Sequence, residues 1–537
     1  MKRSVSICLM ILALAQAIAA QNNGRELWLV RSQTLTSDLL KDGTDLDSFQ
    51  RAVLWLKLAQ RWWREDPKRA RGWIMNAIEV VEQVPNKEKP EEREERLQTA
   101  RVIVTIVTPL DQKLADRVLT FLASDKSTYN EHSAAANALI DAAVAVVQKD
   151  PKRAAALGAM ALRTGNPDNN IQDLLFPLRV RDPKLADSLF VQALALLKQD
   201  PASRLGNSLM FVAFPAQRGV GTDIPVPPDP LRAELLQFYM TLLNPANVEN
   251  PNSICGAVSW LSPLFGEFER LLPQQMPIVR QAISRCQSVS PLLQQQIDDN
   301  TRQEPLNTVE AFLKAAGDAK DMQVRTVYKS RAANLAGENN DYELAIKILE
   351  DMTKEEREFM GEAWESFRWN WAADGAVEHY KNGRFREMNL LLDGVPSDFQ
   401  PFAKAGFLVW LPEQAISETG PIIQILNDAI TGLRRSNTPD SGKHNWYFPL
   451  LRLILKYQPF EGNRVLKDAI SSLNKEKYEK PLDINDPYRK LGATLLEMDE
   501  FVVKDAITSV TDVQARAQLR LALLDATLQR LKTTSRN

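Results

Sequence analysis

Glycine is scarce in this sequence, which has 22 glycines among 537 residues, whereas an average chain has about 7%. Segments in which polar and apolar residues alternate over the length of a strand are also lacking. Alternation bounded by glycine-rich turns is typical of β-sheets. The apolar residues of this chain recur instead at helical spacing. The sequence therefore predicts an all-α protein.

Histidine is scarcer still, and its three copies, His132, His379 and His444, are far apart in the sequence. The chain has no His-Glu-x-x-His motif, no Cys-x-x-Cys pair, no phosphate-binding loop and no Gly-x-Ser-x-Gly elbow. Zinc sites, nucleotide sites and serine hydrolases depend on those patterns. The sequence therefore predicts no catalytic residue, no metal ligand and no cofactor, and it favours a protein that is not an enzyme.

Cysteine is limited to three residues, Cys8, Cys255 and Cys286. Cys8 lies in an N-terminal segment that we expect to be removed. Cys255 stands near the start of one predicted helix and Cys286 near the end of the next, so an antiparallel pairing of the helices places them side by side. We expect a disulfide between them if the chain is exported to an oxidising compartment. The alternative is two buried thiols that behave as small apolar residues.

The chain has no excess of charge of one sign, with 66 basic and 68 acidic residues. Such a balance gives no broad field that would attract nucleic acid. After the N-terminus, no run of about 18 apolar residues is present, which is the length that a membrane-spanning helix needs. We therefore expect no nucleic-acid partner and no integral membrane segment in the mature chain.

The N-terminus begins "MKRSVSICLMILALAQAIAAQNN", in which two basic residues precede a short apolar run and then small residues. This order is typical of a secretory signal peptide. We expect cleavage after Ala19 or Ala20, and therefore a secreted protein of the periplasm or the extracellular space. The alternative is an N-terminal membrane anchor, for which the apolar run is short.

A helix-start signal recurs along the chain. "EDPKRARGWIMNAI" from Glu65, "KDPKRAAALGAMAL" from Lys149 and "RDPKLADSLFVQAL" from Arg181 each place Asp-Pro before a basic residue and an apolar run. The aspartate caps the helix through backbone N–H groups, and proline suits the first helical position because it has no N–H. The dipeptide also occurs at Asp200, Asp229 and Asp486, and Asp111 begins a copy without the proline.

The spacing of these signals indicates an array. The starts at Asp66, Asp111, Asp150, Asp182 and Asp229 are separated by 45, 39, 32 and 47 residues, and a unit of two helices and their turns has this length. The sequence predicts an irregular helical-repeat array, an α-solenoid. The alternative is an ordinary all-α protein whose helices share a favourable cap.

Two segments resemble the tetratricopeptide-like helical repeats. In "ANLAGENNDYELAIKILEDM", Ala333 takes the place of the small packing residue, Tyr342 and Ala345 open the second helix, and Leu349 packs further on. In "HYKNGRFREMNLLLDG", Gly383 and Phe385 take the Gly-x-aromatic positions of the turn. The resemblance covers residues 320–395 and implies pairs of antiparallel helices.

These segments also depart from the pattern of the family. Asn340 replaces the turn glycine, although asparagine tolerates left-handed backbone, and Met388 stands where a small residue is usual. The interval from Tyr342 to Phe385 is 43 residues, against about 34 in the family.

A proline-rich stretch interrupts the helices. The segment "FPAQRGVGTDIPVPPDP" contains five prolines and two glycines, which exclude a regular helix. We expect the following organisation of the chain: a signal peptide (1–20), an N-terminal helical-repeat region (21–214), a loop or hinge (215–230), a middle helical region (231–303) and a C-terminal helical-repeat region (304–537).

The aromatic segment "GEAWESFRWNWAADGAVEHY" gives the best candidate site. Trp364, Phe367 and Trp371 share a helical face, which predicts core packing. Trp369 points away from that face and is the candidate for an exposed contact. Glu365, Glu378 and His379 lie nearby in the sequence and are the candidate binding residues.

Two functions follow from these features. The first is an exported, non-enzymatic helical-repeat protein that presents a surface to a protein or peptide partner. The alternative is an enzyme acting on cell-wall or extracellular glycans, in which aromatic rings stack on sugars and two carboxylates supply acid and base. Some exported transglycosylases resemble this chain in carrying a long helical superhelix. They also have a lysozyme-like catalytic domain, for which this sequence offers no candidate.

Overall fold

The computed structural model of the chain describes residues 25–83, 89–124, 134–164, 170–200, 205–215, 225–243, 251–286, 306–436, 443–476 and 488–534. Every regular element among these residues is a helix, and none is a strand. The prediction of an all-α protein is therefore confirmed. The predicted signal peptide and most of the predicted hinge lie outside the described residues.

The chain divides into two compact units. Unit 1 combines the N-terminal residues up to Gln50 with Thr308–Asn537, and unit 2 comprises Arg51–Asn307. The division falls inside helix α2 (Ser48–Trp62). Unit 1 is thus built from two stretches of sequence that lie far apart along the chain. The five segments expected from the sequence remain predictions.

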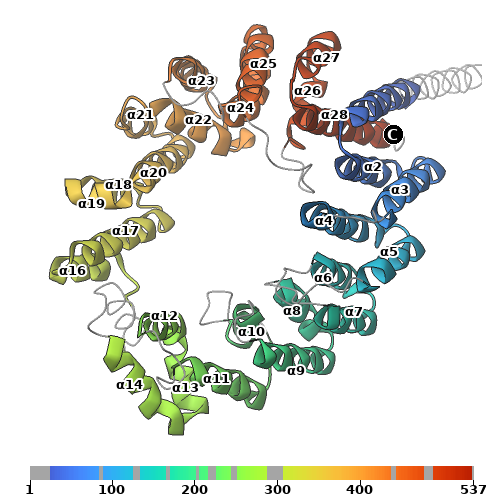
Figure 1. Ribbon diagram of the computed structural model, residues 1–537. Coiled ribbons are helices and arrows are strands. Elements are labelled where there is room, and N and C mark those ends of the chain that lie inside the picture. The colour runs from blue at the N-terminus through green and yellow to red at the C-terminus, as the bar shows by residue number, and fades with distance from the viewer. Residues whose placement is uncertain are drawn as a thin grey trace, which may run out of the picture. The chain divides into compact units, whose positions relative to one another are not determined.

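Unit 2 consists of helices of moderate length (Figure 1). They are α3 (Pro67–Glu82), α4 (Pro90–Val107), α5 (Gln112–Ser124), α6 (Ala134–Val146), α7 (Pro151–Thr164), α8 (Ile171–Arg181), α9 (Pro183–Gln199), α10 (Leu205–Ala213), α11 (Asp229–Leu243), α12 (Pro251–Leu261), η5 (Ser262–Leu264), α13 (Phe265–Leu271), η6 (Pro273–Gln275) and α14 (Met276–Cys286). Within this unit α4, α6, α8 and α10 contact one another in succession, and so do α3, α5, α7, α9 and α11.

The Asp-Pro signals cap helices as expected. Asp66 accepts a hydrogen bond from the backbone N–H of Arg69 before α3, and Asp150 accepts one from Arg153 before α7 at 3.0 Å. Asp182 accepts the N–H groups of the first turn of α9. Asp111 does the same for α5 without a proline. Each carboxylate satisfies donors that a helix start otherwise leaves unpaired.

The prediction of a cap at Asp229 is wrong. Helix α11 begins at Asp229 itself, and the Asp229 carboxylate instead accepts hydrogen bonds from the Arg270 guanidinium at 2.8 and 3.0 Å. This arginine comes from α13, and its distance along the chain hid the pairing from a local analysis. The helix starts expected after Asp200 and Asp486 lie outside the described residues.

The basic residue of the recurring signal also has a tertiary role. Of the two basic residues after Pro151, Lys152 is exposed. Arg153 is half-buried, and its guanidinium donates to Asp116 of α5 at 2.5 Å. In the same way, Arg117 of α5 donates to Glu82 of α3 at 2.7 Å. These pairs join α3 to α5 and α5 to α7.

Replacing Asp150 with alanine is expected to lower the free energy of unfolding by about 1 kcal/mol, since it removes one helix cap. Urea denaturation followed by circular dichroism checks this. Lys152→Ala on the same turn is the matched control and should change stability by less than about 0.5 kcal/mol. Equal effects of the two substitutions would contradict the capping role.

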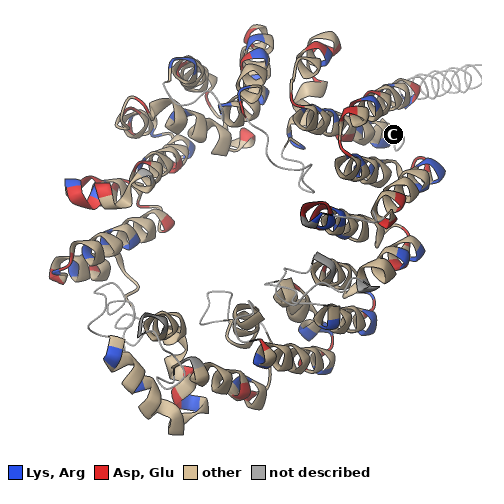
Figure 2. Ribbon diagram, in the orientation of Figure 1, with Lys and Arg blue, Asp and Glu red and all other residues tan. Residues whose placement is uncertain are grey.

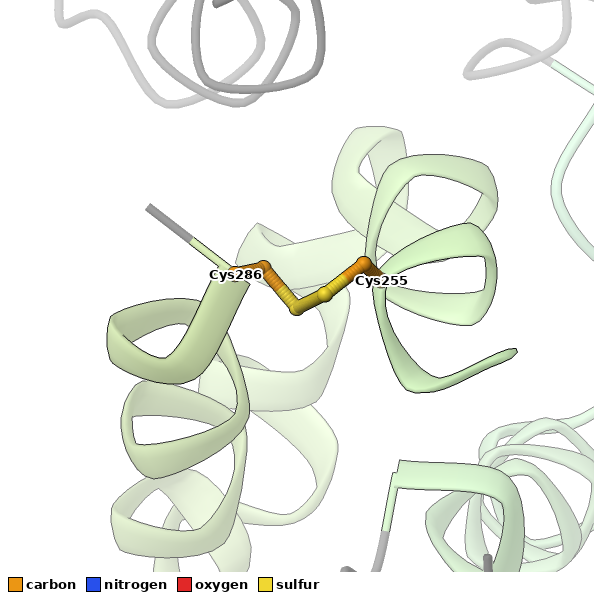
Figure 3. The surroundings of a disulfide bond; sticks show 2 residues. All are labelled: Cys255 and Cys286. Carbon is orange, nitrogen blue, oxygen red and sulfur yellow. A yellow bond between two sulfur atoms is a disulfide. The ribbon is translucent and has the colours of Figure 1, made fainter. Parts of the chain in front are cut away.

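A disulfide joins Cys255 of α12 to Cys286 of α14 (Figure 3). The two Cα atoms are 5.3 Å apart, which lies within the usual range for a disulfide. Both cysteines are buried, and α12 and α14 contact each other. The bond therefore links the first and last helices of the segment from Pro251 to Cys286.

The described part of unit 1 starts with a helix over residues 25–42. Its other elements are η1 (Gly43–Asp45), α16 (Val309–Asp318), α17 (Met322–Glu338), α18 (Tyr342–Glu350), α19 (Lys354–Met360), α20 (Glu362–Lys381), α21 (Phe385–Asp393), α22 (Gln400–Trp410), η7 (Glu413–Ala415), α23 (Thr419–Arg435), α24 (His444–Tyr457), α25 (Pro459–Leu473), α26 (Leu491–Leu496), α27 (Glu500–Thr508) and α28 (Val513–Thr534). Within this unit α20, α22, α24 and α26 contact one another in succession, while α21, α23 and α25 pack beside them (Figure 1).

A buried ion pair ties the N-terminal stretch of unit 1 to its last helix. Asp42 is 6% exposed, and its carboxylate accepts hydrogen bonds from Arg516, at 3.1 Å, and from Arg520. Both arginines belong to α28. Two segments separated by more than 400 positions in the sequence are therefore joined within one unit.

The helix pairs that resemble tetratricopeptide repeats turn where the sequence indicated. Asn340, between α17 and α18, has a φ of 62°, and Gly383, between α20 and α21, has a φ of 70°. Asparagine and glycine adopt this left-handed backbone at lower cost than other residues. Met388 is fully buried, so the position expected to hold a small residue accommodates a flexible side chain instead.

Charged side chains of both signs are interspersed along the helices of each unit, with an acidic concentration at α19 (Figure 2). No described helix has the length and apolar character needed to cross a membrane.

Candidate functional site

Helix α20 carries the aromatic segment, and its two faces belong to different cores. Trp364, Phe367 and Trp371 pack against the core formed by α17 and α18, as their spacing predicted. Trp371 lies directly on Gly337 of α17, where an added Cβ would be 2.7 Å from its ring. The absence of a side chain at Gly337 therefore allows the close approach of α17 and α20.

Trp369 faces the other core and is half-buried rather than freely exposed. Its ring stacks on that of Trp410 with centroids 6.1 Å apart and an interplanar angle of 12°. Trp446 forms a T-shaped pair with Trp369, with ring centroids 5.6 Å apart. Phe402 forms a second T-shaped pair with Trp446, with centroids 5.9 Å apart. We call Trp369, Phe402, Trp410 and Trp446 the aromatic cluster.

The aromatic cluster reaches the surface at the end of α22. Trp410 and Val409 are each 38% exposed, while Phe402 below them is 8% exposed. Stacking on Trp369 holds the Trp410 ring in a fixed orientation, since offset and parallel aromatic pairs are attractive. The cluster thus presents a rigid aromatic face that is partly open to solvent.

A charged group joins the segment after α22 to α24. Glu413 follows Trp410 by three positions, and its carboxylate lies 3.1 Å from Arg452 and 3.2 Å from Lys456 of α24. The side chains of Arg452 and Lys456 are about half exposed, at 54% and 48%. Hydrated charged side chains therefore lie on the segments that also carry Trp410 and Trp446.

The structure does not bring the predicted binding residues Glu365, Glu378 and His379 to the aromatic cluster as one site. Glu378 accepts a hydrogen bond from Asn382 at 2.8 Å and lies 3.8 Å from the Lys381 ammonium. The Glu365 Oε2 atom is buried and makes no hydrogen bond with the described residues. Their roles in binding remain predictions.

Glu365 and Glu378 are both on α20 and are separated by 13 positions. A helix rises about 1.5 Å per residue, so the two backbone positions stand roughly 20 Å apart along its axis. The acid and base of a glycosidase are about 5–10 Å apart. This pair is therefore too far apart to act on one glycosidic bond.

His379 is 4% exposed, and its Nε2 lies 2.7 Å from the Glu343 carboxylate of α18. Since an ionised carboxylate only accepts hydrogen bonds, Nε2 is the protonated nitrogen in this contact. Nδ1 is buried and has no partner among the described residues. The contact links α18 to α20 and joins a buried imidazole to a carboxylate side chain that is 56% exposed.

His444, the other histidine that the structure describes, makes a separate contact. His444 is 3% exposed, and its Nε2 lies 3.1 Å from Glu476. Burial lowers the pKa of His444, and the negative charge of Glu476 opposes that shift. His132 lies outside the described residues. Among the residues that the structure describes, no group of three or more His, Cys, Asp or Glu side chains is arranged to hold a metal ion.

Asp374 of α20 is a titratable group that the sequence did not single out. Burial raises the pKa of its carboxyl, and the nearby charge of Lys381 opposes the shift. Burial also raises the pKa of the Tyr342 hydroxyl, and the charges of Asp374 and Glu378 raise it further. The side of α20 next to α18 therefore favours the protonated forms of these groups.

Sequence reasoning identified Trp369 but missed Trp410, Trp446 and Phe402. They come from α22 and α24, and their distance from Trp369 in the sequence exceeds any helical period. The chain has 11 tryptophans, but their number does not reveal which of the rings pack against one another.

No protein-family model matches this sequence, and a search of curated proteins finds no match either.

Proposed function

We propose that this protein is an exported, non-catalytic helical-repeat protein, an α-solenoid with tetratricopeptide-like helix pairs, that binds a protein or peptide partner. The observation that carries the proposal is the stacked pair Trp369 and Trp410 at the surface of unit 1. Tryptophan, tyrosine and arginine dominate the centres of protein interfaces.

The arrangement of unit 1 supports the repeat architecture in this proposal. Successive contacts among α20, α22 and α24, each with a second helix packed beside it, are what a row of stacked helix pairs requires. The uneven intervals between helix starts agree with an irregular row. The aromatic cluster joins three successive helices of this row, so its geometry depends on their stacking.

The aromatic cluster has the features of a pre-organised binding face. Trp410 loses little freedom on binding because it already stacks on Trp369, and immobilising a side chain typically costs about 0.5–1.5 kcal/mol. Arg452, Lys456 and Glu413, on the same segments, supply polar contacts for the rim, where a typical interface is hydrated. A peptide with an apolar or aromatic side chain fits this combination.

The alternative, an enzyme acting on glycans, has less support. Trp410 is a suitable platform for a sugar ring, but the carboxylates expected to act on the bond, Glu365 and Glu378, are too far apart. A panel of peptidoglycan and polysaccharide substrates tests it. Turnover that is lost in both Glu365→Gln and Glu378→Gln would favour the enzyme.

Replacing Trp410 with alanine is expected to lower affinity for the partner by about 2 kcal/mol, or roughly 30-fold, as for a central interface tryptophan. The measurement is affinity capture from the exported fraction with the immobilised mature chain, followed by a binding titration with the recovered partner. Phe501→Ala, in which a side chain that is 87% exposed on α27 is removed, is the control and should bind normally.

Capture of the same partner in equal amount by Trp410→Ala and the unaltered chain would contradict the proposed surface. Recovery of no specific partner would contradict the proposed function. Thermal melting of each variant checks that loss of binding does not arise from unfolding.

A further inference from the structure

A pocket lies in unit 1 at the turn between α24 and α25, facing α23. It has a volume of about 490 Å³, which lies within the usual range for ligand sites. Arg434 of α23, Tyr457 of α24, and Phe460, Glu461 and Arg464 of α25 are among its lining residues. None of these belongs to the aromatic cluster.

The two arginines of the pocket differ in how their charges are balanced. The Nε of Arg434 donates to the Asp468 carboxylate at 2.7 Å, and its Nη2 lies 3.6 Å from the carboxylate of Glu461. Arg464 is exposed and has no hydrogen bond or ion pair with any described residue. Since Asp468 and Glu461 already surround Arg434, the charge of Arg464 is the one available to a ligand.

The apolar part of the pocket is unusually open. The Phe460 side chain is 98% exposed, and Tyr457 next to it is half-buried. Covering a phenylalanine side chain fully is favourable by about 1.5–3 kcal/mol. An apolar group that enters the pocket therefore gains most by covering Phe460, which lies about one helical turn from Arg464.

We infer that this pocket binds an acidic peptide segment, in which one carboxylate side chain pairs with Arg464 and a neighbouring aromatic side chain covers Phe460. The pairing matches the planar guanidinium, which a carboxylate can engage through two parallel hydrogen bonds. Glu461 disfavours a second carboxylate beside Arg434, so the pocket takes one acidic side chain. The inference rests on the proposed function in that the partner is a peptide, but it uses a different surface.

The experiment uses three fluorescein-labelled peptides and the full mature chain. Their sequences are Gly-Phe-Asp-Phe-Gly, Gly-Phe-Lys-Phe-Gly and Gly-Ala-Asp-Ala-Gly, and binding is measured by fluorescence anisotropy at low salt. The first peptide is expected to bind about tenfold more tightly than each of the others, because only it supplies both the carboxylate and the aromatic group. Added salt should weaken its binding.

Arg464→Glu is expected to weaken binding of the first peptide about tenfold or more, because it places a like charge opposite the carboxylate. Phe460→Ser should weaken it by several-fold through loss of the apolar contact. Arg386→Glu changes an exposed arginine of α21 and is the matched control, with unchanged affinity expected. All three changed residues are surface residues, and equal melting temperatures verify folding.

Equal binding of the three peptides, or unchanged binding in Arg464→Glu, would overturn the inference.

The outcome is separable from that of the proposed function because Trp410→Ala is titrated with the same peptides. If Trp410→Ala loses the captured partner but still binds the first peptide, both proposals stand. If the first peptide depends on Trp410 and not on Arg464, the pocket is excluded and the aromatic cluster is the peptide site. If no partner is captured but peptide binding depends on Arg464, the pocket stands alone.

Discussion

Replacing Glu356 with alanine is expected to lower the free energy of unfolding by about 3–5 kcal/mol, the cost of breaking a buried ion pair. Glu356 of α19 is fully buried. Its carboxylate accepts hydrogen bonds from Arg325 at 2.7 Å and from Lys329 at 2.8 Å, and from the backbone N–H of Thr353 at 2.8 Å. Removing it leaves two cations of α17 without their partner. Urea denaturation followed by tryptophan fluorescence measures the loss.

Glu358→Ala is the matched control on the same helix. The Glu358 side chain is 66% exposed and lies 3.7 Å from Lys354, so its removal should cost less than about 1 kcal/mol. If the two substitutions shift the denaturation midpoint equally, the carboxylate of Glu356 does not stabilise the fold as described.

The contribution of Glu356 also depends on pH. Burial raises the pKa of its carboxyl, but hydrogen bonds from Lys329, Arg325 and Thr353 together lower it below the ordinary value of 4.5. A carboxyl with a lowered pKa stabilises the folded chain above its unfolded pKa, and this stabilisation is lost as the pH falls through the folded pKa. The stability difference between the unaltered chain and Glu356→Gln should therefore be largest near neutral pH and shrink below about pH 4.

The second large effect concerns the disulfide. Replacing both Cys255 and Cys286 with alanine is expected to lower the free energy of unfolding by about 3–4 kcal/mol in the chain-entropy model. The bond closes a loop with a sequence separation of 31 residues, and its loss gives the unfolded chain more conformations. Denaturation of the unaltered chain with and without reductant provides a second measurement. The reductant should destabilise the unaltered chain and leave the double variant unchanged.

Mass spectrometry of the unreduced mature chain after alkylation offers a direct check. An intact bond leaves neither Cys255 nor Cys286 modified, and two alkylated cysteines would contradict it. A disulfide requires an oxidising compartment, so this result also bears on the predicted export.

The helix starts were the most predictable part of the fold, and the failure at Asp229 shows why. At Asp66, Asp150 and Asp182 the cap is a local matter, because the carboxylate meets N–H groups two or three residues later. At Asp229 an arginine 41 residues away competes for the same carboxylate. A local pattern cannot include that competitor.

The candidate site was likewise predicted only in part. Periodicity correctly placed Trp364, Phe367 and Trp371 in a core, because residues on one helical face share an environment. It separated Trp369 from them but did not show that Trp369 packs on Trp410 and Trp446. Those contacts arise from the packing of α20, α22 and α24, and no spacing within one helix encodes them.

The amino-acid sequence alone was enough to predict that the chain is helical, where several helices begin, and that Trp364, Phe367 and Trp371 of α20 face a core. These properties depend on backbone capping, helix propensity and apolar periodicity, all of which act over a few residues. The pairing of Asp42 with Arg516 and Arg520, and that of Arg153 with Asp116, became visible only in the folded chain. The tertiary structure also decided that Arg464 and Phe460 share a pocket, because contacts between distant segments depend on how whole helices pack.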